Sequence, residues 1–124
     1  MDDTRAIVAL GALAQESRLK VFRLLTGRGE RGMAAGEIAR RLGVPHNTLS
    51  THLGLLSQAG LVRARRDGRS IIYSMDLAGV RALLGFLMQD CCNGRPEVCA
   101  PLLDAVAAGC CRPAKARRKP ARAA

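Results

Sequence analysis

Apolar residues recur at helical spacing through the first quarter of the chain. Ile7, Leu10, Leu13 and Ala14 would share one face of a first helix. The sequence TGRGERG, with three glycines, would end the helical pattern in a turn. Between them, a second and better buried helix is predicted from five apolar positions: Leu19, Val21, Phe22, Leu24 and Leu25.

Two further helices are predicted on either side of a tight turn. In MAAGEIARRLGV, Ile38, Ala39 and Leu42 would face inward, and Gly43 would end the helix in the left-handed conformation. Pro45 suits the first turn of the next helix, because proline has no N–H that needs a partner there. That helix, PHNTLSTHLGLLSQAG, combines an apolar stripe with an opposite polar face. The stripe consists of Leu49, Leu53 and Leu56, and the polar face of His46, Asn47, Ser50 and Thr51.

After Gly60 the spacing changes from helical to alternating. LVRARR and RSIIYSM are two β-prone runs joined through Asp67 and Gly68, a pair of residues that strongly predicts a β-hairpin. The tip of this hairpin, RRDGR, is rich in arginine. We therefore expect a small, basic hairpin directly after the fourth helix.

Helical spacing returns in DLAGVRALLGFLMQDCC, where Asp76 is the expected N-cap. One further short helix is predicted to open at Cys99 or Pro101 and to end at Gly109. The order of elements predicts a fold that is mainly α with a small β-hairpin. The apolar face of the helix after the hairpin contains Val80, Leu83, Leu84, Leu87 and Met88.

The central pair of helices is typical of a helix-turn-helix, whose second helix lies in the major groove of DNA. Small polar side chains on that helix can pair with base edges or phosphates, although a polar face can also be simply solvated. The hairpin would then be a wing that contacts phosphates or the minor groove. His52 projects differently from His46, and we expect it to be a hydrogen-bonded histidine near the core. The predicted DNA contacts are His46, Asn47, Thr48, Ser50 and Thr51 on the helix and Arg65, Arg66 and Arg69 on the wing.

Composition narrows the classes of function. The formal charge of +10 favours a polyanionic partner, which could be nucleic acid or an anionic membrane surface. No run approaches the roughly 18 apolar residues that span a bilayer, and MDDTR has two acids where a signal peptide carries positive charge. We therefore expect a cytoplasmic protein without a membrane span. No Ser/His/Asp set, phosphate-binding loop or carboxylate pair indicates an enzyme.

Three motifs stand in a fixed order between Ala9 and Met88: ALAQESRLKVFRLL, GEIARRLGVPHNTLSTHLGLLSQAGLV and RRDGRSIIYSM. Together they resemble the ArsR/SmtB family of winged-helix metal-sensing repressors. The resemblance implies a homodimer joined mainly through its first and last helices, bound to a palindromic operator and released by an inducer. The chain departs from the family at GMAAGEIA, which has no cysteine where the best-known arsenic and cadmium sensors carry ELCVCDL. The His/Asp pattern that family zinc sensors carry on the last helix is also absent.

Five cysteines, an odd number in a chain expected to stay in a reducing compartment, fit no closed disulfide framework. Cys91, Cys92 and Cys99 lie within DCCNGRPEVC, where Gly94 and Pro96 would let the chain turn and bring the third sulfur back. Adjacent cysteines rarely form a mutual disulfide without strain, but an open dithiol is a good chelator. Three thiolates without a nearby histidine suit a soft ion better than Zn²⁺.

Some arsenic-responsive members of the family are similar at this point, with a vicinal cysteine pair after the last helix and a third cysteine a few residues on. The resemblance therefore implies As(III) or Sb(III) as the inducer, held by the sulfurs of Cys91, Cys92 and Cys99 in a pyramid. Cys110 and Cys111 form a second vicinal pair. They could bind a second ion, supply a replacement ligand or take no part in sensing.

Two other functions stay open. The thiols could sense oxidants, with Arg95 as the nearby cation that lowers a thiol pKa. The basic C-terminal tail could instead belong to a nonspecific DNA-compacting protein. The predicted organisation is a DNA-binding and dimerisation domain over residues 1–90, a cysteine-rich inducer-binding segment over residues 91–111, and a disordered basic tail over residues 112–124.

Overall fold

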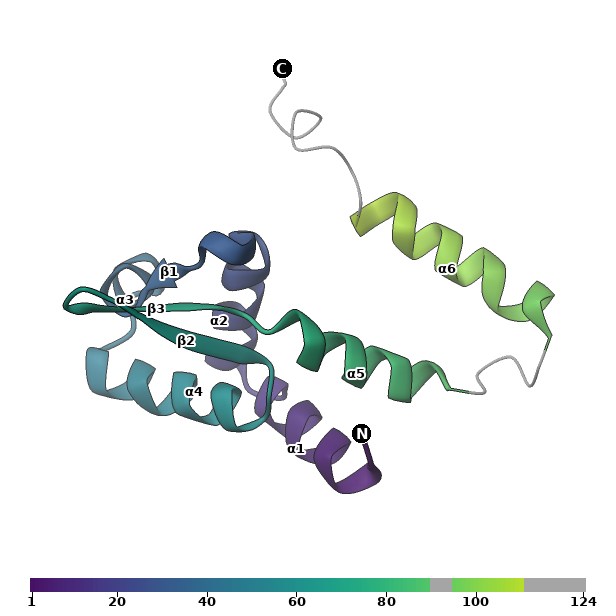
Figure 1. The fold of residues 1–124 in the computed structure, drawn as a ribbon, viewed down its shortest axis with the longest axis horizontal. Helices are drawn as coiled ribbons and strands as arrows, with labels where there is room; N and C mark the ends of the chain where they lie inside the picture. The colour runs from purple at the N-terminus through teal and green to yellow at the C-terminus, as the bar shows by residue number, and fades with distance from the viewer. Residues whose placement is uncertain (90–94, 111–124) are drawn as a thin grey trace, which may run out of the picture. The chain divides into compact units, whose positions relative to one another are not determined.

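The computed structural model describes residues 1–89 and 95–110 of the chain. These residues divide into two compact units, one of Met1–Leu87 and a second from Met88 onward. The predicted domain boundaries, after residues 90 and 111, fall on residues outside the described ranges and stay predictions. The first unit holds five α-helices and a small sheet, and the second holds the helix α6 (Figure 1).

Two short helices open the first unit, α1 over Asp3–Leu13 and α2 over Glu16–Thr26. Each begins with a side-chain N-cap, because Asp2 accepts a hydrogen bond from the Arg5 N–H and Gln15 accepts one from the Arg18 N–H. The Arg18 guanidinium also donates to the Ala12 carbonyl at 2.7 Å, which joins the end of α1 to the start of α2.

The buried face of α1 differs from the predicted one. Ala6, Ala9 and Ala12 are buried, whereas Ile7 is 68% exposed and Leu10 is also exposed. Three alanines in one row let the helix approach the core closely, and the larger apolar side chains then point away from it. The expected inward face is therefore wrong for Ile7, Leu10 and Ala14, and only Leu13 packs at the edge of the core.

For α2 the prediction is largely confirmed. Val21 and Leu25 are fully buried, and Phe22 and Leu24 pack partly against the core. Leu19 is the exception, since it is exposed. It stands two residues before Val21, on a different side of the helix.

The helix-turn-helix forms as predicted. Helix α3 covers Ala35–Leu42 and ends at Gly43, which has the left-handed values φ 66° and ψ 32°. Helix α4 covers His46–Gln58, with Pro45 as its N-cap. The stripe of Leu49, Leu53 and Leu56 is buried in the same core as Ile38 of α3.

A three-stranded antiparallel sheet follows, with the strand order β1-β3-β2. The hairpin of β2 (Val62–Asp67) and β3 (Ser70–Met75) is confirmed, and its turn begins at Gly68 with φ 66°. Strand β1 (Met33–Ala34) was not predicted, because two residues carry no periodic pattern. The three-residue 3₁₀ helix η1 (Gly29–Arg31) leads into β1.

Helix α5 (Leu77–Met88) begins as predicted, with the Asp76 carboxylate accepting a hydrogen bond from the Gly79 N–H at 3.1 Å. Its expected apolar face is only partly buried: Leu83 is buried, but Leu84 and Leu87 are exposed in the single chain. None of the helices in the described part of the chain is long and apolar enough to cross a membrane.

Helix α6 (Pro96–Cys110) is longer than predicted. It was expected to open at Cys99 or Pro101, because a proline inside a helix removes a hydrogen bond. It opens instead at Pro96, which has the same preference for a first helical position, and Pro101 lies inside the helix. The expectation for its start is therefore wrong, and Cys99 lies within the first turn of the helix instead of at or before its first residue.

Candidate nucleic-acid interface

Helix α4 separates its polar and apolar side chains around the axis. The leucine stripe is buried, and five polar side chains on the other face are exposed to solvent. These are His46, Asn47, Thr48, Ser50 and Thr51. All five are the predicted DNA contacts of this helix, and the fold leaves them accessible to a partner.

Two of these side chains make hydrogen bonds within the first turns of α4. The Asn47 carboxamide oxygen accepts a hydrogen bond from the Thr48 N–H at 2.9 Å, and the Thr51 hydroxyl donates to the Asn47 carbonyl at 3.3 Å. Both side chains still face solvent. The hydrogen bonds restrict their rotamers at the N-terminal end of the helix, which is the end of a recognition helix that usually contacts base edges.

The hairpin presents its arginines on two faces. Arg63 and Arg65 lie opposite Ser74 and Ile72 in the ladder, and Arg66 lies opposite Ile71 on the other face. Arg66 and Arg69 are exposed, and no hydrogen bond is seen at either guanidinium among the described residues. Arg65 is different, because its guanidinium donates to two main-chain carbonyl groups of η1.

The hairpin tip and the start of α4 lie on the same side of this unit (Figure 1). They share a surface hollow of about 280 Å³, lined by His46, Arg69 and Ser70 together with the start of α3 and Ile71. The structure therefore brings together one predicted contact of the helix, His46, and one of the wing, Arg69.

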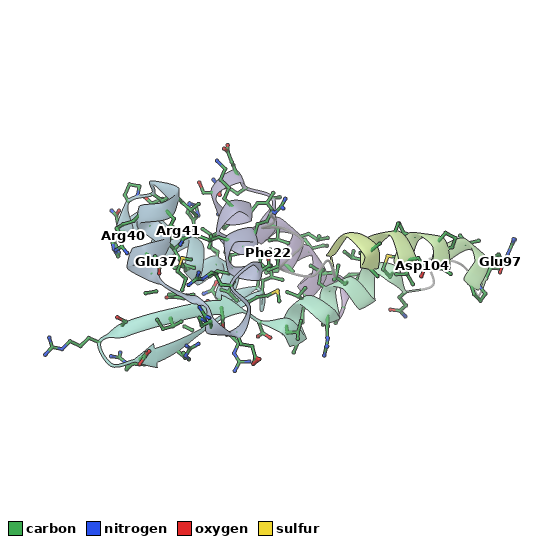
Figure 2. All side chains as sticks on the ribbon, turned by 90° about the horizontal axis from the view of Figure 1, so that it is seen from above. Phe22, Glu37, Arg40, Arg41, Glu97 and Asp104 are labelled. Carbon is green, nitrogen blue, oxygen red and sulfur yellow. The ribbon has the colours of Figure 1, made fainter. Side chains whose placement is uncertain are left out.

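Arg40 of α3 was missed by the sequence reasoning. Its guanidinium and the His46 ring both approach Gly36, at 3.8 and 3.7 Å from the position that a Cβ there would occupy. Figure 2 shows Arg40 beside Arg41 and Glu37 on α3, where Arg41 and Glu37 form an ion pair at 3.4 Å. The ion pair engages Arg41 and leaves Arg40 to add positive charge next to His46. The signal in the sequence was the Arg-Arg pair within GEIARRLG.

Comparisons with known proteins agree with this geometry. A family model described as a helix-turn-helix domain matches residues 13–65. The transcriptional activator HlyU of Vibrio cholerae is 30% identical over 92 residues, which cover 74% of this chain and 82% of that protein. The structure of HlyU superposes with a TM-score of 0.57, covering 72% of this chain and 96% of that one. The chain belongs to the ArsR/SmtB family.

Two other relatives of this ArsR/SmtB-family chain add detail. A Halobacterium salinarum protein named ArsR is 37% identical over 70 residues, 56% of this chain and 54% of that protein. The homodimeric winged helix-turn-helix domain of Mb0332 from Mycobacterium bovis is 28% identical, with a TM-score of 0.56, and covers 77% of this chain and 94% of that one. Family members are DNA-binding transcriptional regulators and not enzymes, and they include proteins named as repressors of mercury and arsenical resistance operons.

The predicted inducer site of this ArsR/SmtB-family regulator lies mostly outside the described residues. Cys91, Cys92 and Cys111 fall there, and Cys110 is the last residue of α6. Cys99 is described, and it is buried in the first turn of α6. Within residues 1–89 and 95–110, no group of three or more His, Cys, Asp or Glu side chains could hold a metal ion. The three-cysteine site therefore stays a prediction.

The two histidines of α4 have opposite surroundings. His46 is exposed, and His52 is only 9% exposed, so the expected position of His52 near the core is confirmed. Its Nδ1 atom, however, has no hydrogen-bond partner among the described residues, so the expected hydrogen bond is not found at that atom. A buried ring nitrogen without a partner costs free energy, which the surrounding apolar packing must offset.

Proposed function

We propose that this ArsR/SmtB-family regulator is a metalloid-responsive repressor. It would bind operator DNA as a homodimer and leave the DNA when As(III) or Sb(III) binds to Cys91, Cys92 and Cys99. The observation that carries the proposal is a pattern in the sequence, where Cys91, Cys92 and Cys99 lie within nine residues that contain no histidine. Soft thiolates without imidazole suit a trivalent metalloid better than Zn²⁺.

The DNA-reading surface in this proposal is the exposed polar face of α4, together with the wing. His46, Asn47, Thr48, Ser50 and Thr51 would enter the major groove, where small donors and acceptors read base edges. Arg66 and Arg69 would contact phosphates. The hollow shared by His46 and Arg69 supports a single interface made of both elements.

A homodimer is supported by apolar side chains that the single chain leaves uncovered. Ile7, Val8 and Leu10 of α1 and Leu84 and Leu87 of α5 are all exposed. Exposed apolar groups on two helices mark an interaction surface, and the Mb0332 domain is described as homodimeric. Two copies would place two α4 helices on successive major grooves of a palindromic site.

In this proposal the residues divide as the sequence predicts: reading and dimerisation over residues 1–90, inducer binding over residues 91–111 and a basic tail over residues 112–124. Metalloid binding would pull Cys99 toward Cys91 and Cys92 and so reshape the chain that follows the last helix of the DNA-binding domain. Because α5 also carries part of the exposed apolar surface, that movement would alter the dimer interface and the spacing of the two α4 helices.

The expected response to the inducer is release of the DNA, although the relative HlyU is named an activator.

The test begins with the reduced full-length protein and a duplex selected from a random pool. Fluorescence anisotropy compares the selected palindrome with shuffled DNA at one salt concentration, and then follows release by arsenite, antimonite, Zn²⁺ and Cd²⁺. Arsenite is expected to weaken DNA binding by about 10- to 100-fold, the usual range of coupling between two sites. Zn²⁺ is expected to have little effect.

Cysteine variants decide whether the site is the one proposed. The double variant Cys91→Ser/Cys92→Ser is expected to bind DNA normally and to lose the response to arsenite. The matched control is Cys110→Ser/Cys111→Ser, which removes the other vicinal pair and is expected to keep it. If release by arsenite survives in the first variant, the proposed site is wrong. Release by peroxide alone would instead support a redox sensor, and equal affinity for palindromic and shuffled DNA would support DNA compaction.

A further inference from the structure

Arg65 joins the wing to a segment more than thirty positions earlier in the chain. Its Nη1 atom donates to the Glu30 carbonyl and its Nη2 atom to the Arg31 carbonyl, each at 3.3 Å. The two acceptors are consecutive, so one planar guanidinium spans both. Arg65 therefore makes two hydrogen bonds within the protein, although the sequence predicts it as a DNA contact.

The acceptor segment has carbonyl groups that need partners. Glu30 and Arg31 end the three-residue helix η1, and the last carbonyls of a helix have no donor within it. The chain then passes through Gly32, which has the positive φ of 68°. A cation is favourable at a helix C-terminus because the carbonyl dipoles converge there. Arg65 meets both requirements with one side chain.

The donor strand is one of the two edge strands of the sheet. The order β1-β3-β2 leaves β2 paired with β3 on one side only. The Arg65 contact attaches β2 to η1, and η1 leads through Gly32 and β1 directly into α3, the first helix of the helix-turn-helix. The contact therefore links the wing to the element that carries the recognition helix.

We propose that Arg65 is a wing-positioning residue, which holds the hairpin at a defined angle to the helix-turn-helix so that Arg66 and Arg69 meet DNA. This rests on the proposed function, because it assigns a role within the same DNA interface. The proposal gives the arginines of the wing different binding partners. Arg65 bonds to the protein, and Arg66, on the opposite face of β2, bonds to phosphate.

The substitution Arg65→Lys tests the proposal at constant charge. A lysine ammonium is a point donor and cannot span two carbonyls as a guanidinium does. We expect DNA affinity to fall about tenfold, the size of one lost hydrogen bond to a charged group, with no change in the salt dependence of binding. The matched control Arg63→Lys makes the same exchange at an exposed position on the same face of β2, outside the proposed DNA contacts, and is expected to bind within about twofold of the original chain. Affinity in Arg65→Lys equal to that of the original chain would overturn the proposal.

Neutral variants provide a second measurement. Arg66→Gln is expected to make the negative slope of log K against log salt shallower by about 1, because it removes one phosphate contact. Arg65→Gln is expected to weaken binding while leaving that slope unchanged. A slope reduced equally in both variants would show that Arg65 contacts phosphate, and would overturn the proposal.

Amide hydrogen exchange tests the same contact without DNA. Exchange along β2 and at Gly32 is expected to be faster in Arg65→Lys than in Arg66→Lys, because only the first variant releases the wing from η1. Unchanged exchange in Arg65→Lys would overturn the proposal. If the original chain shows no preference for any palindrome, the proposed function fails, but the exchange measurement still decides the role of Arg65.

Discussion

Gly79 stands in the first turn of α5, where the helix contacts the turn that follows α4. A Cβ at this position would collide with the Gly60 carbonyl oxygen. The same junction is held by a hydrogen bond from the Asp76 N–H to the Leu61 carbonyl at 2.9 Å. Since two backbones touch here, glycine is required by packing and not by a turn.

Substitution of Gly79 is therefore expected to destabilise the protein. Gly79→Ala should lower the free energy of unfolding by about 2 kcal/mol or more, because overpacking against backbone forces α5 to shift. The control is Gly85→Ala in the same helix, where a Cβ meets nothing within 4 Å. It should raise stability by up to about 1 kcal/mol through helix propensity. Urea denaturation of both variants measures the difference, and equal effects would contradict the packing argument.

At the scale of an element, α2 shows how local charges stabilise the start of a helix. Glu16 lies in its first turn, where a carboxylate interacts favourably with the helix dipole. Lys20, one turn later, donates a hydrogen bond to Glu16 at 2.9 Å. That hydrogen bond, together with the charge of Lys20, holds the pKa of the Glu16 carboxyl below its ordinary value of 4.5.

Removal of the ammonium should raise this pKa. In Lys20→Met, the pKa of Glu16 is expected to return toward its ordinary value, while Lys20→Arg keeps it lowered. Because the folded-state pKa is the lower one, the pair stabilises the fold above the unfolded-state pKa of Glu16. That contribution is lost as the pH falls through the folded-state value. An NMR titration of the carboxyl carbon measures the shift, and an identical titration of Lys20→Met and the original chain would exclude this cause.

At the scale of the whole molecule, the exposed apolar side chains of α1 and α5 would be buried between the two subunits of the proposed dimer. Leu84 is 55% exposed in the single chain, on the helix that also carries the exposed Leu87. An exposed leucine is common, but several on two helices of one unit form a surface that favours association. The stability of the DNA-binding form then depends on protein concentration.

A charge on this surface should separate the two copies. Leu84→Glu is expected to raise the dimer dissociation constant about a hundredfold or more, because a buried unpaired carboxylate costs about 3 kcal/mol. The control Ala82→Glu adds the same charge to an exposed position about 200° around the same helix. Sedimentation velocity over a range of concentrations measures both. If Leu84→Glu remains dimeric at the concentrations where the original chain does, α5 is not in the interface.

The amino-acid sequence by itself determined the elements that depend on neighbours in the chain. Gly43 ends α3, the leucine stripe orients α4, Gly68 turns the hairpin and Asp76 caps α5. Each of these is settled by contacts over a few residues, which a local pattern records. The exposed polar face of α4 follows from the same periodicity, so the residues of the candidate interface could be named without a structure.

Only the tertiary structure decided the features that join distant segments. Strand β1 forms because β3 lies beside it about forty residues later, and α1 buries its alanines because other helices approach on that side. In the sequence, Arg65 cannot be distinguished from the other arginines of the wing. Its two acceptors belong to η1, which precedes the helix-turn-helix, whereas Arg65 follows it. Long-range contacts of this kind leave no periodic signal in a single sequence, because the partners are chosen by how whole elements pack together.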